Sequence, residues 1–172
     1  KVSIAKKANL HFSLEEDLPL VEADEAQLQQ VILNLVTNAS DAIGDREGEI
    51  RVTTCARILD ETFISVTFPS QGLTPGLYAV LEVGDTGVGM TPEVLARIFD
   101  PFFTTKPTGH GLGLSAIQGI LRGHRAGLKV YSEPGRGTSF QVYLPATSAP
   151  RPQAALVHSD PSDVVLCGRV LL

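Results

Sequence analysis

The chain has few cysteines, no long apolar run and no stripe dense in lysine and arginine, and each absence excludes a class of protein. Cys55 and Cys167 lie far apart and make neither a zinc quartet nor a disulfide framework, which suits a reducing cytoplasm. The apolar stretches are too short to cross a bilayer, and the N-terminus lacks the layout of a signal peptide. The formal net charge of −5 argues against nucleic-acid binding. We therefore expect a cytoplasmic protein that binds no nucleic acid.

The chain is long enough for one compact domain and a tail. It has 172 residues, and its first residues read like the middle of a longer polypeptide. After Pro145 the composition changes to alanine, serine and proline, which is typical of a linker. We predict a folded domain over residues 1–145 and a linker over residues 146–172.

Apolar periodicity predicts alternating strands and helices. A long helix is expected from an N-cap at Asp24, with Gln27 placed as in a capping box, to Gly44. Shorter helices are expected after the cap Thr91, to about residue 97, and over residues 111–123. Residues 60–76 are predicted to form a strand or an irregular segment that ends in a loop. The predicted strands are residues 10–14, 50–56 and 78–84 and a closing hairpin of residues 129–132 and 138–144.

A carboxylate stands where the apolar strand 78–84 ends, in the run Asp85-Thr-Gly-Val-Gly89. Side chains alternate along a strand, so Asp85 shares the face of Val83, which is the buried face. A buried carboxylate is costly unless hydrogen bonds reach it, and the glycines let a flat or anionic ligand approach the backbone. The run therefore indicates a carboxylate that accepts a hydrogen bond from a ligand's amino group. The alternative is an acidic turn that closes a hairpin.

Polar side chains recur on one edge of the long predicted helix. Asn34, Asn38 and Asp41 fall within an arc of roughly 60° at about 100° per residue. Amide oxygens on a helix edge suit Mg²⁺, which takes few protein ligands together with phosphate and water. A solvated polar face is the alternative interpretation.

A glycine-rich run opens the helix predicted over residues 111–123. In Gly109-His-Gly-Leu-Gly113 the backbone N–H groups can form an anion site, although the run is neither a dinucleotide fingerprint nor a P-loop. Lys106, just before it, can reach a terminal phosphate or be an ordinary solvated lysine. The hydroxyl of Thr138 is expected to point inward and to need a partner. Three phenylalanines in the preceding loop are expected to anchor a lid or to join the core: Phe99, Phe102 and Phe103.

Together and in this order, the motifs resemble the ATP-binding catalytic domain of sensor histidine kinases, in the superfamily shared with gyrase, Hsp90 and MutL. The resemblance covers roughly residues 5–145. The boxes are residues 30–42 (N box), 85–90 (first G box), 98–106 (F box), 109–114 (second G box) and the closing residues 137–140. It implies an α/β two-layer sandwich, with a mixed, mainly antiparallel sheet and helices on one face, and ATP between the layers under a lid.

The resemblance also implies roles for single residues. Asn38 becomes the Mg²⁺ ligand, and Asn34 and Lys106 become catalytic groups near the phosphates. Asp85 becomes the ligand of the adenine amino group, with Thr138 nearby through water. The other implied nucleotide-binding residues are Asp41, Gly87, Gly89, Met90, Gly109, His110, Gly111, Leu112 and Gly113.

Departures from the family pattern refine the function that it implies. ATP-hydrolysing relatives carry a glutamate base where this chain has Asn34, so autonomous ATPase activity is not expected. None of the histidines fits the phosphate-accepting pattern, so the γ-phosphoryl is expected to pass to a histidine on a separate dimerisation domain of the parent chain. An ATPase or switch, an anti-sigma-type serine kinase and a non-catalytic nucleotide sensor remain alternatives. The histidines are His11, His110, His124 and His158.

The resemblance further implies partners. A response regulator receiver domain would take the phosphoryl group onward, and the parent would be a homodimer, membrane-anchored or not, whereas this fragment alone would be monomeric. The segment Gly168-Arg-Val-Leu-Leu172 resembles the start of a receiver domain, as in hybrid kinases, or is a frayed extension.

Overall fold

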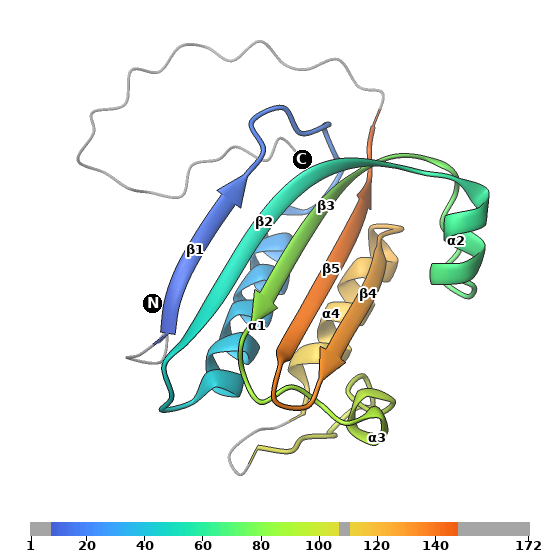
Figure 1. The fold of residues 1–172 in the computed structure, drawn as a ribbon. Coiled ribbons are helices and arrows are strands. Elements are labelled where there is room, and N and C mark those ends of the chain that lie inside the picture. Colours follow the sequence, from blue (N-terminus) through green and yellow to red (C-terminus); the bar gives the residue numbers. More distant parts are fainter. Residues whose placement is uncertain (1–7, 107–110, 148–172) are drawn as a thin grey trace.

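A computed structural model describes residues 8–106 and 111–147, and its centre is a five-stranded sheet in the order β1-β2-β3-β5-β4 (Figure 1). β1 pairs with β2 in parallel, and the three other pairings are antiparallel. The mixed, mainly antiparallel sheet is therefore confirmed. The strands are β1 (Ala8–Leu14), β2 (Gly48–Leu59), β3 (Gly76–Asp85), β4 (Gly127–Glu133) and β5 (Gly137–Pro145).

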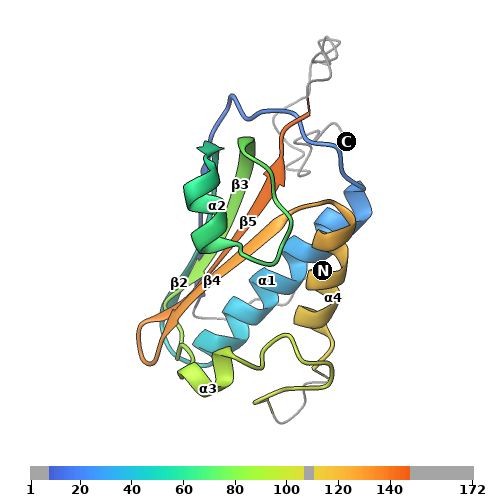
Figure 2. The same cartoon turned by 90° about the vertical axis from the view of Figure 1, so that its right-hand side faces the viewer.

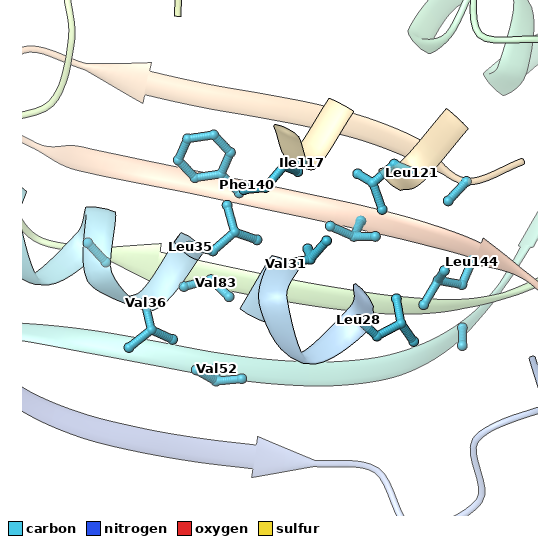
Figure 3. Packing of buried hydrophobic residues seen from close by; sticks show 14 of the residues in the cluster. Leu28, Val31, Leu35, Val36, Val52, Val83, Ile117, Leu121, Phe140 and Leu144 are labelled. Atoms are coloured by element: carbon cyan, nitrogen blue, oxygen red, sulfur yellow. The ribbon is translucent and has the colours of Figure 1, made fainter. Parts of the chain in front are cut away.

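Two helices, α1 (Glu25–Ile43) and α4 (Gly113–Gly123), cover one face of this sheet (Figure 2). Their apolar stripes pack onto alternate residues of β2, β3 and β5, as the period-two pattern of strands requires (Figure 3). This layer confirms the predicted two-layer sandwich. Its labelled core residues are Leu28, Val31, Leu35, Val36, Val52, Val83, Ile117, Leu121, Phe140 and Leu144.

The start of α1 is held by a residue of α4's end. Asp24 is the N-cap as predicted, and its Oδ1 accepts a hydrogen bond from the Gln27 N–H at 3.0 Å. The reciprocal half of the predicted capping box does not form, because the Asp24 N–H donates instead to Nε2 of His124 at 2.9 Å. Since Nδ1 of His124 lies 2.8 Å from the Ile120 carbonyl, the neutral ring carries its proton on Nδ1.

The prediction of a strand or irregular segment is wrong for Glu61–Thr67, which form helix α2. Asp60 caps this helix by accepting from the Phe63 N–H at 2.7 Å. α2 lies on the face of the sheet opposite α1 (Figure 2). Ile64 and Phe68 bury their side chains in a cluster with Tyr143. The cap and this packing outweigh the β-branched residues of the segment, which favour a strand. The second face of the sheet therefore has a small core of its own at one end.

The described part of the segment between β3 and α4 contains one short helix, α3 (Pro92–Leu95), which ends earlier than predicted. The Phe102 N–H donates to the Gly111 carbonyl at 3.0 Å, which joins the F-box loop to the start of α4. Gly111 needs its positive φ of 66° here, and a side chain at this position would overlap the Phe102 backbone. Across the described ranges, no helix has both the length and the apolar character that a bilayer span requires.

Candidate functional site

Three polar side chains lie in one row across the sheet, facing the helix layer. Asp85 on β3 is paired with Thr138 on β5, which is paired in turn with Ser132 on β4. Thr138 is buried, and its Oγ1 lies 2.9 Å from Oγ of Ser132. The Ser132 hydroxyl also accepts from the Met90 N–H at 2.9 Å. Ser132 is thus the partner that the inward-facing Thr138 was expected to need.

The Asp85 carboxylate combines burial with backbone hydrogen bonds. Its Oδ1 accepts from the Gly87 N–H at 2.7 Å. Burial raises the pKa of this carboxyl above its ordinary value of 3.8, although backbone hydrogen bonds from Gly87 and Thr138 work in the opposite direction. A partly desolvated carboxylate therefore stands at the end of β3, facing the helix layer.

The loop after Asp85 is held from two sides. The Val88 N–H donates to the Ala42 carbonyl at the end of α1 at 3.0 Å. The Val88 carbonyl accepts from the Gly135 N–H of the β4–β5 turn at 2.7 Å. The first G box is therefore a rigid bridge between the helix layer and the closing hairpin.

Gly87 and Gly89 are required by this bridge. A Cβ on Gly87 would lie 2.6 Å from the backbone carbon of Ala42, and one on Gly89, whose φ is +63°, would overlap the Glu133 carbonyl. Close approach of backbone to backbone explains both glycines. Their predicted place beside the base stays a prediction.

Lys106 lies against the polar edge of α1. Its Nζ is 2.9 Å from Oδ1 of Asn38 and 2.7 Å from Oδ2 of Asp41. Asn34 is half-buried one turn before Asn38 on the same helix. The structure therefore gathers Asn38, Asp41 and Lys106 near the end of α1 that also contacts the first G box, whereas Asn34 lies at the middle of the helix.

The described part of the second G box is an open helix start. α4 begins at Gly113, two residues later than predicted, and Leu112 provides no side-chain cap. The free N–H groups of a first helical turn favour anions. Gly109 and His110 lie outside the described residues.

The phenylalanines of the F box have different surroundings. Phe99 packs against the main core, and the Arg97 guanidinium lies 4.4 Å from the centre of the Phe103 ring. Phe102 is 75% exposed and has a positive φ of 68°, which is unusual for a residue with a side chain.

The donor set at the edge of α1 fits Mg²⁺. In the described ranges no group of three or more His, Cys, Asp and Glu side chains could hold a metal ion. Asn38 and Asp41 nevertheless already share a cation, the Lys106 ammonium, through two oxygen atoms. Mg²⁺ prefers such oxygen ligands and completes its shell with phosphate and water.

A cavity lies beside this site. Its volume is about 280 Å³, and its lining includes Asp85 and Thr138 together with Arg51, Gly84, Ser139 and Tyr131. The last four residues form a row across the sheet, one position away from the row of Asp85 and Thr138. Because side chains alternate, Arg51, Ser139 and Tyr131 point to the face of the sheet opposite the Asp85 side chain, while Asp85 and Thr138 also line the cavity.

Comparison with known proteins defines the class. Residues 23–148 match the family described as "Histidine kinase-, DNA gyrase B-, and HSP90-like ATPase", and the chain belongs to this family. It is 38% identical over 141 residues to the sensor histidine kinase ZraS of Salmonella typhimurium, covering 82% of this chain and 26% of the relative. It is also 38% identical over 150 residues to the sensory histidine kinase/phosphatase NtrB of Rhizobium meliloti, covering 86% and 37%.

Solved structures agree. The catalytic domain of histidine kinase ThkA, nucleotide-free, has a TM-score of 0.61 and 30% identity, covering 81% of this chain and 80% of that one. Full-length ShkA in complex with AMPPNP has a TM-score of 0.63 and 28% identity, covering 83% of this chain and 27% of that one. The chain has the sequence and fold of a sensor histidine kinase's ATP-binding catalytic domain. It spans 26% and 37% of the lengths of these two curated relatives.

Proposed function

We propose that this chain binds ATP with Mg²⁺ and transfers the γ-phosphoryl group to a histidine on a separate dimerisation domain. One observation carries the proposal: Asp85 and the Asn38–Asp41–Lys106 cluster lie at the same end of the sandwich. The Val88–Ala42 hydrogen bond joins the loop after Asp85 to the end of α1. The carboxylate proposed to bind the adenine base and the residues proposed to bind the cation are thereby connected by a backbone hydrogen bond.

Different residues of the chain bind the base and the phosphates of the nucleotide. Asp85, as a carboxylate, accepts a hydrogen bond from the adenine amino group, and Thr138 supports the same end of the site. Asn38 is the protein ligand that would hold Mg²⁺, which when bound neutralises phosphate charge. The uncapped start of α4 and the Lys106 ammonium supply N–H donors to the phosphates. AMPPNP in the related ShkA structure supports this type of ligand.

The reaction needs positioning and charge stabilisation more than covalent chemistry by this chain. The neutral nitrogen of the acceptor histidine attacks the γ-phosphorus. A P–N bond forms, the bond to the bridging oxygen breaks, and ADP leaves. Lys106 offsets the negative charge on the transferred group.

Asn34 favours transfer to histidine over hydrolysis. An amide cannot take a proton from water, so the position one turn before Asn38 provides no general base. The relatives are named as histidine kinases, which supports transfer of the phosphoryl group to histidine and not to water. A receiver domain that takes the phosphoryl group from the histidine and a dimeric parent protein complete the proposal.

The test is phosphotransfer in a reconstituted mixture. The chain is incubated with γ-labelled ATP, Mg²⁺ and a separately produced dimerisation domain of a ZraS-type relative, and the label on the added domain is measured. We expect acid-labile, base-stable label on that domain, none when its histidine is replaced, and no phosphate release above background without it. Phosphate release with no labelled domain would contradict the proposal and favour an ATPase.

A further inference from the structure

The Lys106 ammonium contacts the same oxygen atom that the proposed function assigns to Mg²⁺. Lys106 lies 68 residues after Asn38 in sequence, yet its Nζ is 2.9 Å from the Asn38 Oδ1 that would hold Mg²⁺. A magnesium ligand lies at about 2.1 Å. Two cations that contact one amide oxygen repel each other, so Lys106 and Mg²⁺ cannot both bind Oδ1 of Asn38.

We propose that Lys106 is the resident cation of the nucleotide-free chain, and that Mg²⁺ replaces it on Asn38 when the nucleotide binds. Asp41 is the positioning residue that holds Lys106 there. This inference rests on the proposed function and adds to it a cation exchange on the N box.

The contacts of Lys106 explain why it is held and why it can leave. Its backbone N–H donates to Oγ1 of Thr104 at 3.0 Å, so its own loop fixes where the side chain starts. Its Nζ is 2.7 Å from Oδ2 of Asp41, with the two side chains 38% and 47% exposed. Ion pairs this open to solvent are weak, so an incoming divalent cation bound to phosphate can displace the lysine.

The exchange couples the metal to the F-box loop. In the nucleotide-free chain, Lys106 ties the end of that loop to α1. Once Mg²⁺ takes the Asn38 oxygen, the ammonium is freed from Asn38 and can turn towards the phosphates. Lys106 therefore performs its proposed phosphate role only after the metal has arrived.

Nitrogen-15 NMR of the lysine ammonium groups tests the exchange directly. The signal of Lys106 in the 172-residue chain is assigned by its loss in Lys106→Arg. We expect it to be shifted from solvent-exposed lysines without nucleotide, to lose that shift in Asp41→Asn and to keep it in Asp41→Glu. Addition of ADP with Mg²⁺ should move the signal, whereas ADP with a chelator should not.

A binding measurement gives an independent readout. At saturating ADP, the Mg²⁺ concentration for half-maximal effect should fall about two- to five-fold in Lys106→Met, because a weak ion-pair competitor is removed. Lys129→Met removes the same charge from the β4 side chain that lies 5.8 Å from the Phe63 ring, and should leave this concentration unchanged.

Three outcomes would overturn the inference. They are a Lys106 signal that matches free lysine in the nucleotide-free chain, a signal that moves equally with and without Mg²⁺, and an unchanged Mg²⁺ requirement in Lys106→Met. If no adenine nucleotide binds, the proposed function fails and the exchange fails with it. The nucleotide-free signal would then still report separately whether Asp41 holds Lys106.

Discussion

At the scale of single residues, the charge of Asp85 lowers the stability of the fold but favours the proposed binding of adenine. Burial raises the pKa of its carboxyl above the ordinary value of 3.8. At pH values between the ordinary pKa and the raised pKa of the folded state, the folded state binds the proton more tightly than the unfolded state. The free energy of unfolding therefore falls as the pH rises from the ordinary pKa to the raised pKa. At neutral pH the ionised carboxylate destabilises the nucleotide-free fold, and the same charge is what an adenine amino group needs as acceptor.

Asp85→Asn should therefore raise the melting temperature of the nucleotide-free chain at pH 7, with a gain that shrinks as the pH falls towards 3.8. The amide still accepts from the Gly87 N–H, so the loop is preserved. ADP affinity should fall about 10- to 150-fold, since a hydrogen bond to a charged acceptor contributes about 1.5–3 kcal/mol. Thermal unfolding and ADP titration of both proteins check this; a variant that is less stable and binds ADP normally would refute it.

Residue-scale prediction from sequence succeeded where alternation was enough. Strand parity placed Asp85 and Thr138 on the face towards the helices, and helical spacing placed Asn38 and Asp41 on one edge. Ser132 was missed, although it pairs with Thr138 across the closing hairpin. Assigning the cross-strand register of that hairpin would have revealed it.

At the scale of elements, a single histidine joins the start of α1 to the end of α4. His124 accepts the Asp24 N–H at Nε2 and directs Nδ1 to the Ile120 carbonyl. His124→Phe keeps an aromatic ring at this position and removes both nitrogen atoms. It should lower stability by about 0.5–1.5 kcal/mol, which corresponds to a fall in melting temperature of roughly 2–8 °C.

Calorimetry of the nucleotide-free chain measures this change. His11→Phe, the same substitution at an exposed position of the edge strand β1, is the matched control and should leave the melting temperature almost unchanged. Equal melting temperatures for the two variants would show that the His124 bridge adds nothing beyond ring packing.

Helices and strands were predictable where the local spacing of apolar residues determines them. They were not predictable where contacts between residues distant in sequence determine them. The His124–Asp24 contact joins residues 100 positions apart, which no local pattern predicts. In α2, Thr62, Ile64 and Val66 favour a strand, yet the Asp60 cap and the packing of Ile64 turn the segment into a helix.

At the scale of the whole molecule, the sandwich separates the end with the candidate site from the end with α2. The turn between β4 and β5, the first G box and the end of α1 meet at one end through hydrogen bonds of Gly135, Val88 and Ala42. α2 lies towards the other end, on the opposite face of the sheet (Figure 2), and its apolar residues Ile64 and Phe68 form a cluster with Tyr143. The family motifs predicted the two-layer sandwich from sequence, but not the position of α2, which the sequence analysis expected to be a strand or irregular segment. The approach of Lys106 to Asn38 required the fold, since 68 residues separate them.

The central claim is that the end of the sandwich with Asp85 and Asn38 binds an adenine nucleotide with Mg²⁺. Calorimetric titration of the chain with ADP, with and without Mg²⁺, alongside Asn38→Ala, tests it most directly. We predict that wild type binds ADP more tightly with Mg²⁺, and that Asn38→Ala still binds but without the Mg²⁺ effect. Absence of ADP binding by wild type in both conditions, or an undiminished Mg²⁺ effect in Asn38→Ala, would contradict the claim.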